Sequence, residues 1–307
     1  MNTDIIRTES ISKHYGDVHA VSDMSLNVRK GEIYGFLGLN GAGKTTTIRM
    51  LLGLIRPTSG AAFINGKKIS FDNTELWKSV GSLVEIPYSY PELTVRENLE
   101  IIRRLRFIAD NKAIDNVIDK LQLGAYANRK AKDLSLGNNQ RLGLAKALIH
   151  NPEILLLDEP TNGLDPAGIY EIREMLSDLA INGVTIFISS HILGEISRFA
   201  TRIGIIHEGK LLKEIDAIKL ETLCSRHLLI NANDIGMAKS ILTQNGYIIE
   251  ITNDNLLETN DESAISKPDS IATILVNAGC PPTLLKVEEE DLESYFLKTI
   301  GMKGGLQ

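Results

Sequence analysis

Residues 31–45 read GEIYGFLGLNGAGKT. The part Gly31–Gly38 is a short apolar run that enters a glycine-rich turn, which predicts a buried strand. The part Gly38–Thr45 satisfies the pattern G-x-x-x-x-G-K-[ST] of a phosphate-binding loop. In such a loop, glycines let backbone N–H groups turn toward anionic oxygens, and a helix that begins near Thr45 adds the positive end of its dipole. This stretch therefore predicts a strand, a phosphate site and a helix in immediate succession.

Two side chains of the loop carry the chemistry. Lys44 supplies a positive charge for the β- and γ-phosphates of a nucleotide, and the Thr45 hydroxyl can ligate Mg²⁺. The alternative is a chance glycine-rich turn, which average residue usage produces in about one chain of this length per hundred. The flanking strand and helix patterns make this alternative weaker, and we expect ATP and Mg²⁺ to bind here.

A second group of candidates lies at the ends of other predicted strands. The segment ILLLDEP ends an apolar strand in Asp158 and Glu159, so Asp158 would lie near the Mg²⁺ and Glu159 could deprotonate the attacking water. Alone, this pair would be read as a cap of the next helix. His191 closes the strand VTIFISSH and could bond the γ-phosphate, although an isolated histidine is more often structural. Tyr15 is a candidate platform for the adenine ring and could equally be a core residue.

Strand and helix patterns alternate through the first two thirds of the chain. A helix is predicted from Thr45 to Ile55, a turn at Asn65-Gly66, two amphipathic helices between Pro87 and Leu134, and a helix from about Asn138 to His150. RIGIIHEGKLL predicts a closing hairpin with its turn at Glu208-Gly209. This alternation predicts parallel strands with helical crossovers, hence an α/β core.

The pattern and the charge composition of the sequence change beyond about Lys219. Strand and helix patterns there follow the order β-α-β-β-α-β with a final helix. From Glu221 onward there are six Lys/Arg against thirteen Asp/Glu, whereas the preceding part has 27 and 26. We therefore expect a small acidic α+β accessory domain over 219–307. A nearly neutral first part and an acidic end also argue against a nucleic-acid partner, which needs a basic face.

Between the two halves of the predicted site stands LSLGNNQR, residues 134–141. In this setting it resembles the signature motif of ABC (ATP-binding cassette) ATPases. Tyr15 then resembles the A-loop aromatic, Gly38–Thr45 the Walker A motif, Ile154–Asp158 the Walker B motif, Gly163-Leu164-Asp165 the D-loop, and His191 the switch histidine. These landmarks occur in family order from residue 1 to about 215.

The resemblance implies a fold and a set of site residues. The fold is an α/β P-loop NTPase of the ABC ATPase type over 1–218, with a parallel sheet core, an antiparallel β subdomain and a helical subdomain at about 86–150. The implied catalytic residues are Glu159, His191 and Lys44, and the implied metal residues are Thr45, Asp158 and Glu85. The implied nucleotide-binding residues are Tyr15, Gly38, Leu39, Asn40, Gly41, Ala42, Gly43, Lys44, Thr45, Thr46, Ser135, Gly137 and Asp165.

The resemblance also implies a dimer, homo or hetero. In this family two ATPase domains pair head to tail, and each ATP lies between one Walker A motif and the partner's signature. Ser135 and the Gly137 N–H would then contact the γ-phosphate bound by the other chain. Leu136 replaces the glycine usual in the signature, and it would be strained if that position required a positive φ.

Asn138 replaces the glutamine of the signature, and Glu85 is a further departure from the family pattern. Glu85 stands where the family usually has a glutamine that touches Mg²⁺ and senses the membrane partner. With the SLG signature, it makes the chain resemble the ATPase subunits of bacitracin and lantibiotic self-protection exporters. We therefore expect Glu85 to contact Mg²⁺ or its water and to couple to a permease loop. A solvated acid at a strand end is the alternative.

We accordingly expect an ATPase at the inner face of the cell membrane, held there by a separate permease that contacts the exported peptide antibiotic. No apolar run reaches the roughly 18 residues of a membrane helix, and the first residues show no signal-peptide pattern. Export of another drug, lipid or ion is one alternative. A soluble ABC ATPase of DNA repair or translation, not coupled to a membrane protein, is another, although the chain has neither a long insertion between its motifs nor two ATPase halves.

Overall fold

The computed structural model describes residues 4–70, 73–85, 87–223, 226–252, 254–289 and 292–301. The chain divides into two compact units, Met1–Ile218 and Lys219–Gln307. Each unit has a hydrophobic core of its own, and each is described by itself.

The first unit is built on a six-stranded sheet in the order β11-β10-β4-β9-β8-β7. Its strands are β4 (Ile33–Leu37), β7 (Val80–Leu83), β8 (Ile154–Asp158), β9 (Thr185–Ser190), β10 (Arg202–His207) and β11 (Lys210–Asp216). Neighbouring strands are parallel except β10 and β11, which form the predicted hairpin. Every residue of β4, β8 and β9 is buried, because central parallel strands have both faces covered. The α/β core is confirmed.

A second, antiparallel sheet packs onto the same core. It runs β2-β1-β5-β6, and β3 also pairs with β1. The strands are β1 (Asp4–Tyr15), β2 (Val18–Met24), β3 (Asn27–Arg29), β5 (Ser59–Ile64) and β6 (Lys67–Lys68). Asn65 and Gly66 form the predicted turn, both with positive φ, as a two-residue hairpin requires.

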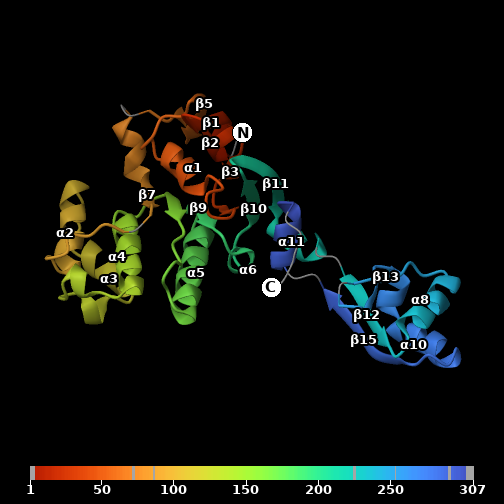
Figure 1. Cartoon of the computed structure of the whole chain (residues 1–307). Coiled ribbons are helices and arrows are strands. Elements are labelled where there is room, and N and C mark those ends of the chain that lie inside the picture. Colours follow the sequence, from red (N-terminus) through yellow and green to blue (C-terminus); the bar gives the residue numbers. More distant parts are fainter. Residues whose placement is uncertain are drawn as a thin grey trace. The chain divides into compact units, whose positions relative to one another are not determined.

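Helices connect the strands and surround the sheets. They are α1 (Lys44–Leu51), α2 (Val95–Leu105), α3 (Ala113–Lys120), α4 (Leu136–Leu148), α5 (Pro166–Ile181) and α6 (Leu193–Ile196), with 3₁₀ turns η1 (Thr74–Ser79), η2 (Gly124–Tyr126) and η3 (Ala131–Asp133). The helix α7 (Ala217–Leu223) begins at the end of this unit and continues into the second. Figure 1 shows α2, α3 and α4 grouped on the β7 side of this unit. Thr94 starts α2 with a capping box, in which Thr94 and Glu97 bond each other's backbone N–H.

Two predicted helix boundaries are wrong. The helix after the phosphate loop ends at Leu51 rather than Ile55, because Gly53 adopts a left-handed conformation with φ of 65° and ends the repeat. The helix predicted from about Asn138 to His150 spans Leu136–Leu148. The Ser135 hydroxyl accepts the N–H of Asn138 at 3.3 Å and so caps the helix two residues earlier.

The second unit is a four-stranded antiparallel sheet in the order β13-β14-β12-β15. Its elements are β12 (Arg226–Ala232), α8 (Ile235–Gln244), β13 (Glu250–Ile251), β14 (Leu257–Thr259), α9 (Glu262–Ser266), α10 (Pro268–Asn277), β15 (Pro282–Glu289) and α11 (Leu292–Thr299). This is the predicted β-α-β-β-α-β order with one added short helix, α9. The second strand in this order, β13, is only two residues long.

Candidate active site

The loop Gly38–Thr45 joins the end of β4 to the start of α1. The Gly38 N–H donates to the Ser190 carbonyl at 3.1 Å, which fixes the start of the loop to the end of β9. Gly41 and Gly43 have φ of 82° and 106°, values that side-chain-bearing residues rarely adopt. A Cβ on Gly43 would also collide with the Ala20 carbonyl oxygen. The glycines are therefore required by the path of the loop.

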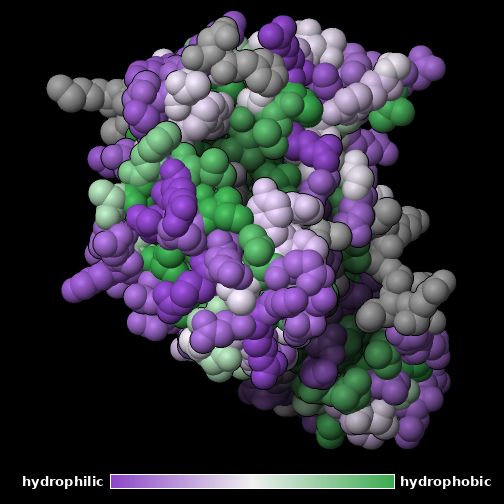
Figure 2. Space-filling view, turned by 90° about the vertical axis from the view of Figure 1, so that its left-hand side faces the viewer, coloured by the Kyte–Doolittle hydropathy of each residue, from purple (hydrophilic) through white to green (hydrophobic). Residues whose placement is uncertain are grey.

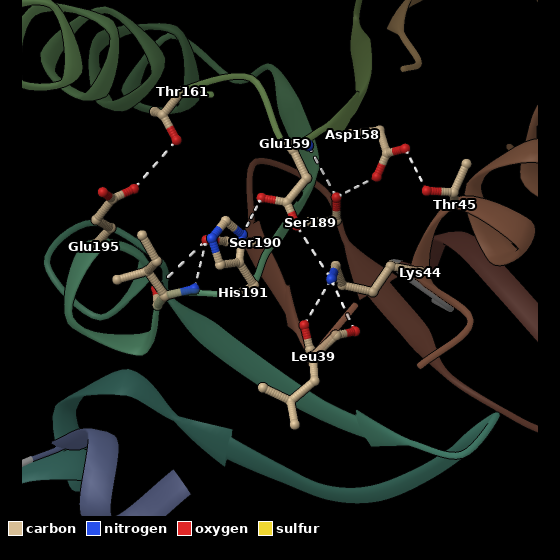
Figure 3. Close-up of polar contacts among 12 residues, drawn as sticks. Leu39, Lys44, Thr45, Asp158, Glu159, Thr161, Ser189, Ser190, His191 and Glu195 are labelled. Carbon is tan, nitrogen blue, oxygen red and sulfur yellow. Dashed lines mark hydrogen bonds and ion pairs between the residues drawn. The ribbon is translucent and has the colours of Figure 1, made fainter. Parts of the chain in front are cut away.

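Lys44 lies under this loop with only 6% of its surface exposed. Its Nζ donates to the carbonyl oxygens of Gly38 at 2.6 Å and Leu39 at 3.2 Å. It also lies 3.1 Å from Glu159 Oε1, as Figure 3 shows. A buried cation surrounded by oxygen acceptors in this way is suited to receive phosphate oxygens.

Asp158 stands opposite the loop at the carboxyl end of β8. Its Oδ2 accepts from Thr45 Oγ1 at 2.7 Å and its Oδ1 accepts from Ser189 Oγ at 2.6 Å. Among the described residues no group of three or more His, Cys, Asp or Glu could hold a metal by itself. Thr45 and Asp158 nevertheless fit Mg²⁺, because this ion is commonly held by one or two protein oxygens together with substrate phosphates and water.

Glu159 is the most constrained residue of the site. It has a positive φ of 49°, and its N–H donates to Ser189 Oγ at 3.0 Å. Glu159 Oε2 lies 2.8 Å from His191 Nδ1. Its Oε1 forms the ion pair with Lys44 but accepts no hydrogen bond, although it is buried. A buried carboxylate oxygen with an unused acceptor position can receive a proton from water.

Five residues that were predicted to form one site thus lie together (Figure 3), namely Lys44, Thr45, Asp158, Glu159 and His191. They come from the carboxyl ends of β4, β8 and β9, which are adjacent strands. Two residues that contact the site were not foreseen. Ser189 bonds both Asp158 and Glu159, and the Gln140 amide donates to the Glu159 carbonyl at 3.2 Å. The only sequence signal for Ser189 is a polar residue in an apolar strand.

Ser135, Gly137 and Asp165 are placed elsewhere, at the beginnings of two helices. Ser135 caps α4, and Asp165 caps α5 by accepting the Gly168 N–H at 2.9 Å. Ser135 and Asp165 are exposed. Leu136 lies in the first turn of α4 and has no positive φ, so it carries none of the strain considered for that position.

Tyr15 and Glu85 are also outside the group around Lys44. Tyr15 is 47% exposed at the end of β1, with Lys13 Nζ 5.0 Å from its ring centroid. Its ring is therefore accessible for stacking. Glu85 has φ of 59° and forms an exposed ion pair with Arg49 of α1. Arg49 is four residues from Thr45, hence on the same face of α1.

Comparison with known proteins identifies the family. The model of the ABC transporter family matches residues 21–162. The bacitracin transport ATP-binding protein of Bacillus licheniformis is 43% identical over 300 residues, which cover 97% of either chain. The chain belongs to the ATP-binding proteins of ABC transporters.

Other members of this family support the same assignment. The lantibiotic transport ATP-binding protein of Streptococcus pyogenes is 37% identical over 228 residues, which cover 73% of this chain and 98% of that protein. A solved dimer of an ATP-binding cassette in a post-hydrolysis state with ADP and Pi has a TM-score of 0.64 and 27% identity, and covers 69% of this chain and 98% of that one. This ABC protein is thus an ATPase, of a family whose ATPase domains act as dimers with a membrane permease.

Proposed function

We propose that this chain hydrolyses ATP with the residues gathered around Glu159 and thereby powers export of a peptide antibiotic through a separate permease. The observation that supports the catalytic part is the position of the Glu159 carboxylate, with Oε2 on His191 and Oε1 beside Lys44. One residue thus contacts both the switch histidine and the lysine of the phosphate loop.

The reaction is a transfer of the γ-phosphoryl group to water. Oε1 of Glu159 takes a proton from the attacking water, whose oxygen forms a bond to the γ-phosphorus. The bond from that phosphorus to the β,γ-bridging oxygen breaks, and ADP keeps its electron pair. Lys44 and the loop N–H groups stabilise the negative charge on the phosphate oxygens, and His191 orients the carboxylate.

Mg²⁺ would be held by the Thr45 hydroxyl and Asp158, where the ion screens the charge of the triphosphate. Their oxygens already lie 2.7 Å apart, joined by a hydrogen bond. Both groups are hard oxygen donors, which this ion prefers.

The site would be completed by a second ATPase domain. Ser135 is exposed at the N-terminus of α4, where free backbone N–H groups and the helix dipole favour an anion. The Ser135 hydroxyl oxygen accepts the N–H of Asn138, which belongs to the same helix. The hydroxyl and the Gly137 N–H are therefore available to a γ-phosphate held by the partner's loop, as in the head-to-tail pairing of this family.

A groove next to Glu85 is the proposed contact for the permease. It has a volume of about 580 Å³ and is lined by Leu52, Gly53, Leu54, Trp77, Val80, Ser82, Val84 and Arg106. Leu54 is 60% exposed in this groove. Figure 2 faces the α2 side of the first unit and shows hydrophobic side chains grouped among polar ones. No helix in the described part of the chain has the length and apolar character to cross a bilayer.

The proposal that the substrate is a peptide antibiotic is based on related proteins. Two proteins with high coverage are named for bacitracin transport and lantibiotic transport. The test is expression of the chain with a candidate permease in a sensitive bacterium, with growth measured in bacitracin, in a lantibiotic and in an unrelated drug. We expect protection against one of the two peptide classes, lost in E159Q. Protection only against the unrelated drug would refute the peptide assignment, and protection that persists in E159Q would refute the role of Glu159.

A further inference from the structure

Ser189 is a polar residue in a strand with no exposed position. All six residues of β9 are buried, and Ser189 is 0% exposed. Its neighbours in the sheet are Phe36 of β4 and Asp158 of β8. An apolar side chain would be the ordinary occupant here, because a buried hydroxyl is costly unless it is hydrogen-bonded.

The hydroxyl of Ser189 makes two hydrogen bonds. It donates to Asp158 Oδ1 at 2.6 Å and accepts from the N–H of Glu159 at 3.0 Å. The strand register explains this, since Asp158 and Ser189 are direct partners in the parallel pair of β8 and β9. Figure 3 shows the hydroxyl between the two acidic residues.

The bond to Asp158 sets the orientation of its carboxylate. The single hydroxyl proton of Ser189 is donated to Asp158 Oδ1, so Asp158 Oδ2 points to Thr45 Oγ1, 2.7 Å away. Without the hydroxyl, rotation of the carboxylate would be restrained only at the Thr45 side. Partners of this kind fix the geometry of groups that hold a metal.

The hydrogen bond from the Glu159 N–H to Ser189 fixes the backbone conformation of Glu159. Glu159 has a left-handed φ of 49°, a conformation that is unfavourable for a residue with a side chain. Its N–H is held by Ser189. The direction in which the Glu159 carboxylate leaves the chain, toward Lys44 and His191, depends on this conformation.

We propose that Ser189 is a positioning residue whose hydroxyl fixes both the orientation of the Asp158 carboxylate and the backbone conformation of Glu159. One hydroxyl thus positions the group that would hold the metal and the group that takes the proton. This inference rests on the proposed roles of Asp158 and Glu159. It predicts that loss of the hydroxyl affects Mg²⁺ use and turnover together, while leaving the binding of metal-free nucleotide intact.

The test compares S189A with S189T and with the control T185V. Thr185 is 1% exposed in the same strand, and its hydroxyl accepts the Gly31 N–H at 3.0 Å at the end away from the site. T185V therefore removes a buried hydroxyl without touching Asp158 or Glu159. For each protein we would measure kcat, KM, melting temperature, the Mg²⁺ concentration for half-maximal rate, and the affinity for a non-hydrolysable ATP analogue with and without Mg²⁺.

We expect S189A to lower kcat about 10- to 100-fold and to weaken the gain in analogue affinity that Mg²⁺ gives. Its affinity without Mg²⁺ should stay at the wild-type value. S189T keeps the hydroxyl and should recover most of the rate, and T185V should keep a wild-type kcat even where its melting temperature falls. If S189T does not fold, the comparison of S189A with T185V still decides the question.

Wild-type turnover and Mg²⁺ dependence in S189A would overturn the inference, as would an equal loss of kcat in T185V. D158N separates this failure from failure of the proposed function. If D158N has normal Mg²⁺ dependence, the metal role of Asp158 itself is wrong. If D158N loses it and S189A does not, only the role of Ser189 is wrong.

Discussion

The side chain of Leu136 lies against Gly163, so that a Cβ added to Gly163 would be 2.6 Å from Leu136 Cγ. A Cβ on Gly137 would in turn meet the Gly163 carbonyl oxygen at 3.2 Å. The signature segment and the D-loop of one chain are therefore in direct contact. The leucine that departs from the family signature is accommodated because residue 163 has no side chain.

This contact predicts that G163A is destabilising for two reasons. Gly163 has φ of 78°, and the new methyl group would displace Leu136. We expect a loss of about 1–3 kcal/mol in the free energy of unfolding. The double variant L136A/G163A removes the collision but keeps the backbone strain, so a coupling of about 0.5–1 kcal/mol should appear in a double-mutant cycle measured by urea denaturation.

G66A is the control for backbone strain alone. Gly66 has φ of 71°, and nothing lies within 4 Å of a Cβ placed there. Its cost should be about 1 kcal/mol and should not change when L136A is added. Strictly additive costs for L136A and G163A would show that the two residues do not interact.

A second prediction concerns turnover. E159Q keeps the size of the side chain but cannot take the proton from water, so kcat should fall at least about 100-fold while ATP still binds. The variant should accumulate as an ATP-bound dimer in size-exclusion chromatography. E174Q is the control, because Glu174 is an exposed residue of α5 whose ion pair with Arg173 spans 3.8 Å. Normal cycling of E159Q would remove Glu159 from the role of base.

The sequence predicted the elements that meet at the site, because its motifs lie at the ends of strands. Gly38–Thr45, Asp158 and His191 follow apolar runs, and the carboxyl ends of neighbouring parallel strands share one edge of a sheet. The β4, β9, β8 order that makes them neighbours is a tertiary property, which no local pattern in the sequence predicts.

Contacts that depend on register could not be predicted in this way. A shift of one residue between β8 and β9 would turn Ser189 to the other face of the sheet, and no local pattern fixes that register. The pair of Arg49 in α1 and Glu85, two residues after the end of β7, joins positions 36 residues apart. Helix ends were also missed, because Ser135 competes with Asn138 as the cap and only the backbone path decides between them.

A third prediction follows from the ion pair of Glu85 with Arg49. Both side chains are substantially exposed, at 54% and 36%, so the pair contributes at most about 1 kcal/mol to stability. E85Q should therefore fold normally. If Glu85 couples the site to the permease, E85Q should lower antibiotic protection and the ATPase rate of the assembled transporter. E75Q removes an acid that is also exposed, at 67%, and paired with Lys78, and it should change neither the ATPase rate nor protection. An unchanged rate and unchanged protection in E85Q would refute coupling through Glu85.

The last prediction is a pH dependence of stability from His150. Its Nε2 bonds the Val80 carbonyl at 3.1 Å, while its Nδ1 is buried without a hydrogen-bond partner. Burial and the nearby charge of Arg106 lower the pKa of His150 from 6.5 to about 4. Between these values the unfolded chain binds the proton and the folded chain does not. The contribution of neutral His150 to the free energy of unfolding is therefore complete above pH 6.5 and is lost as the pH falls toward 4.

H150Q can still donate to the Val80 carbonyl but has no proton to gain. We expect the wild type to lose about 1–2 kcal/mol more than H150Q between pH 7 and pH 4.5, measured by urea denaturation at both values. The carboxylates that titrate in this range are the same in the two proteins, so the difference isolates residue 150. Equal slopes for H150Q and the wild type would mean that His150 accepts its proton in the folded chain, and that a side chain or water reaches Nδ1.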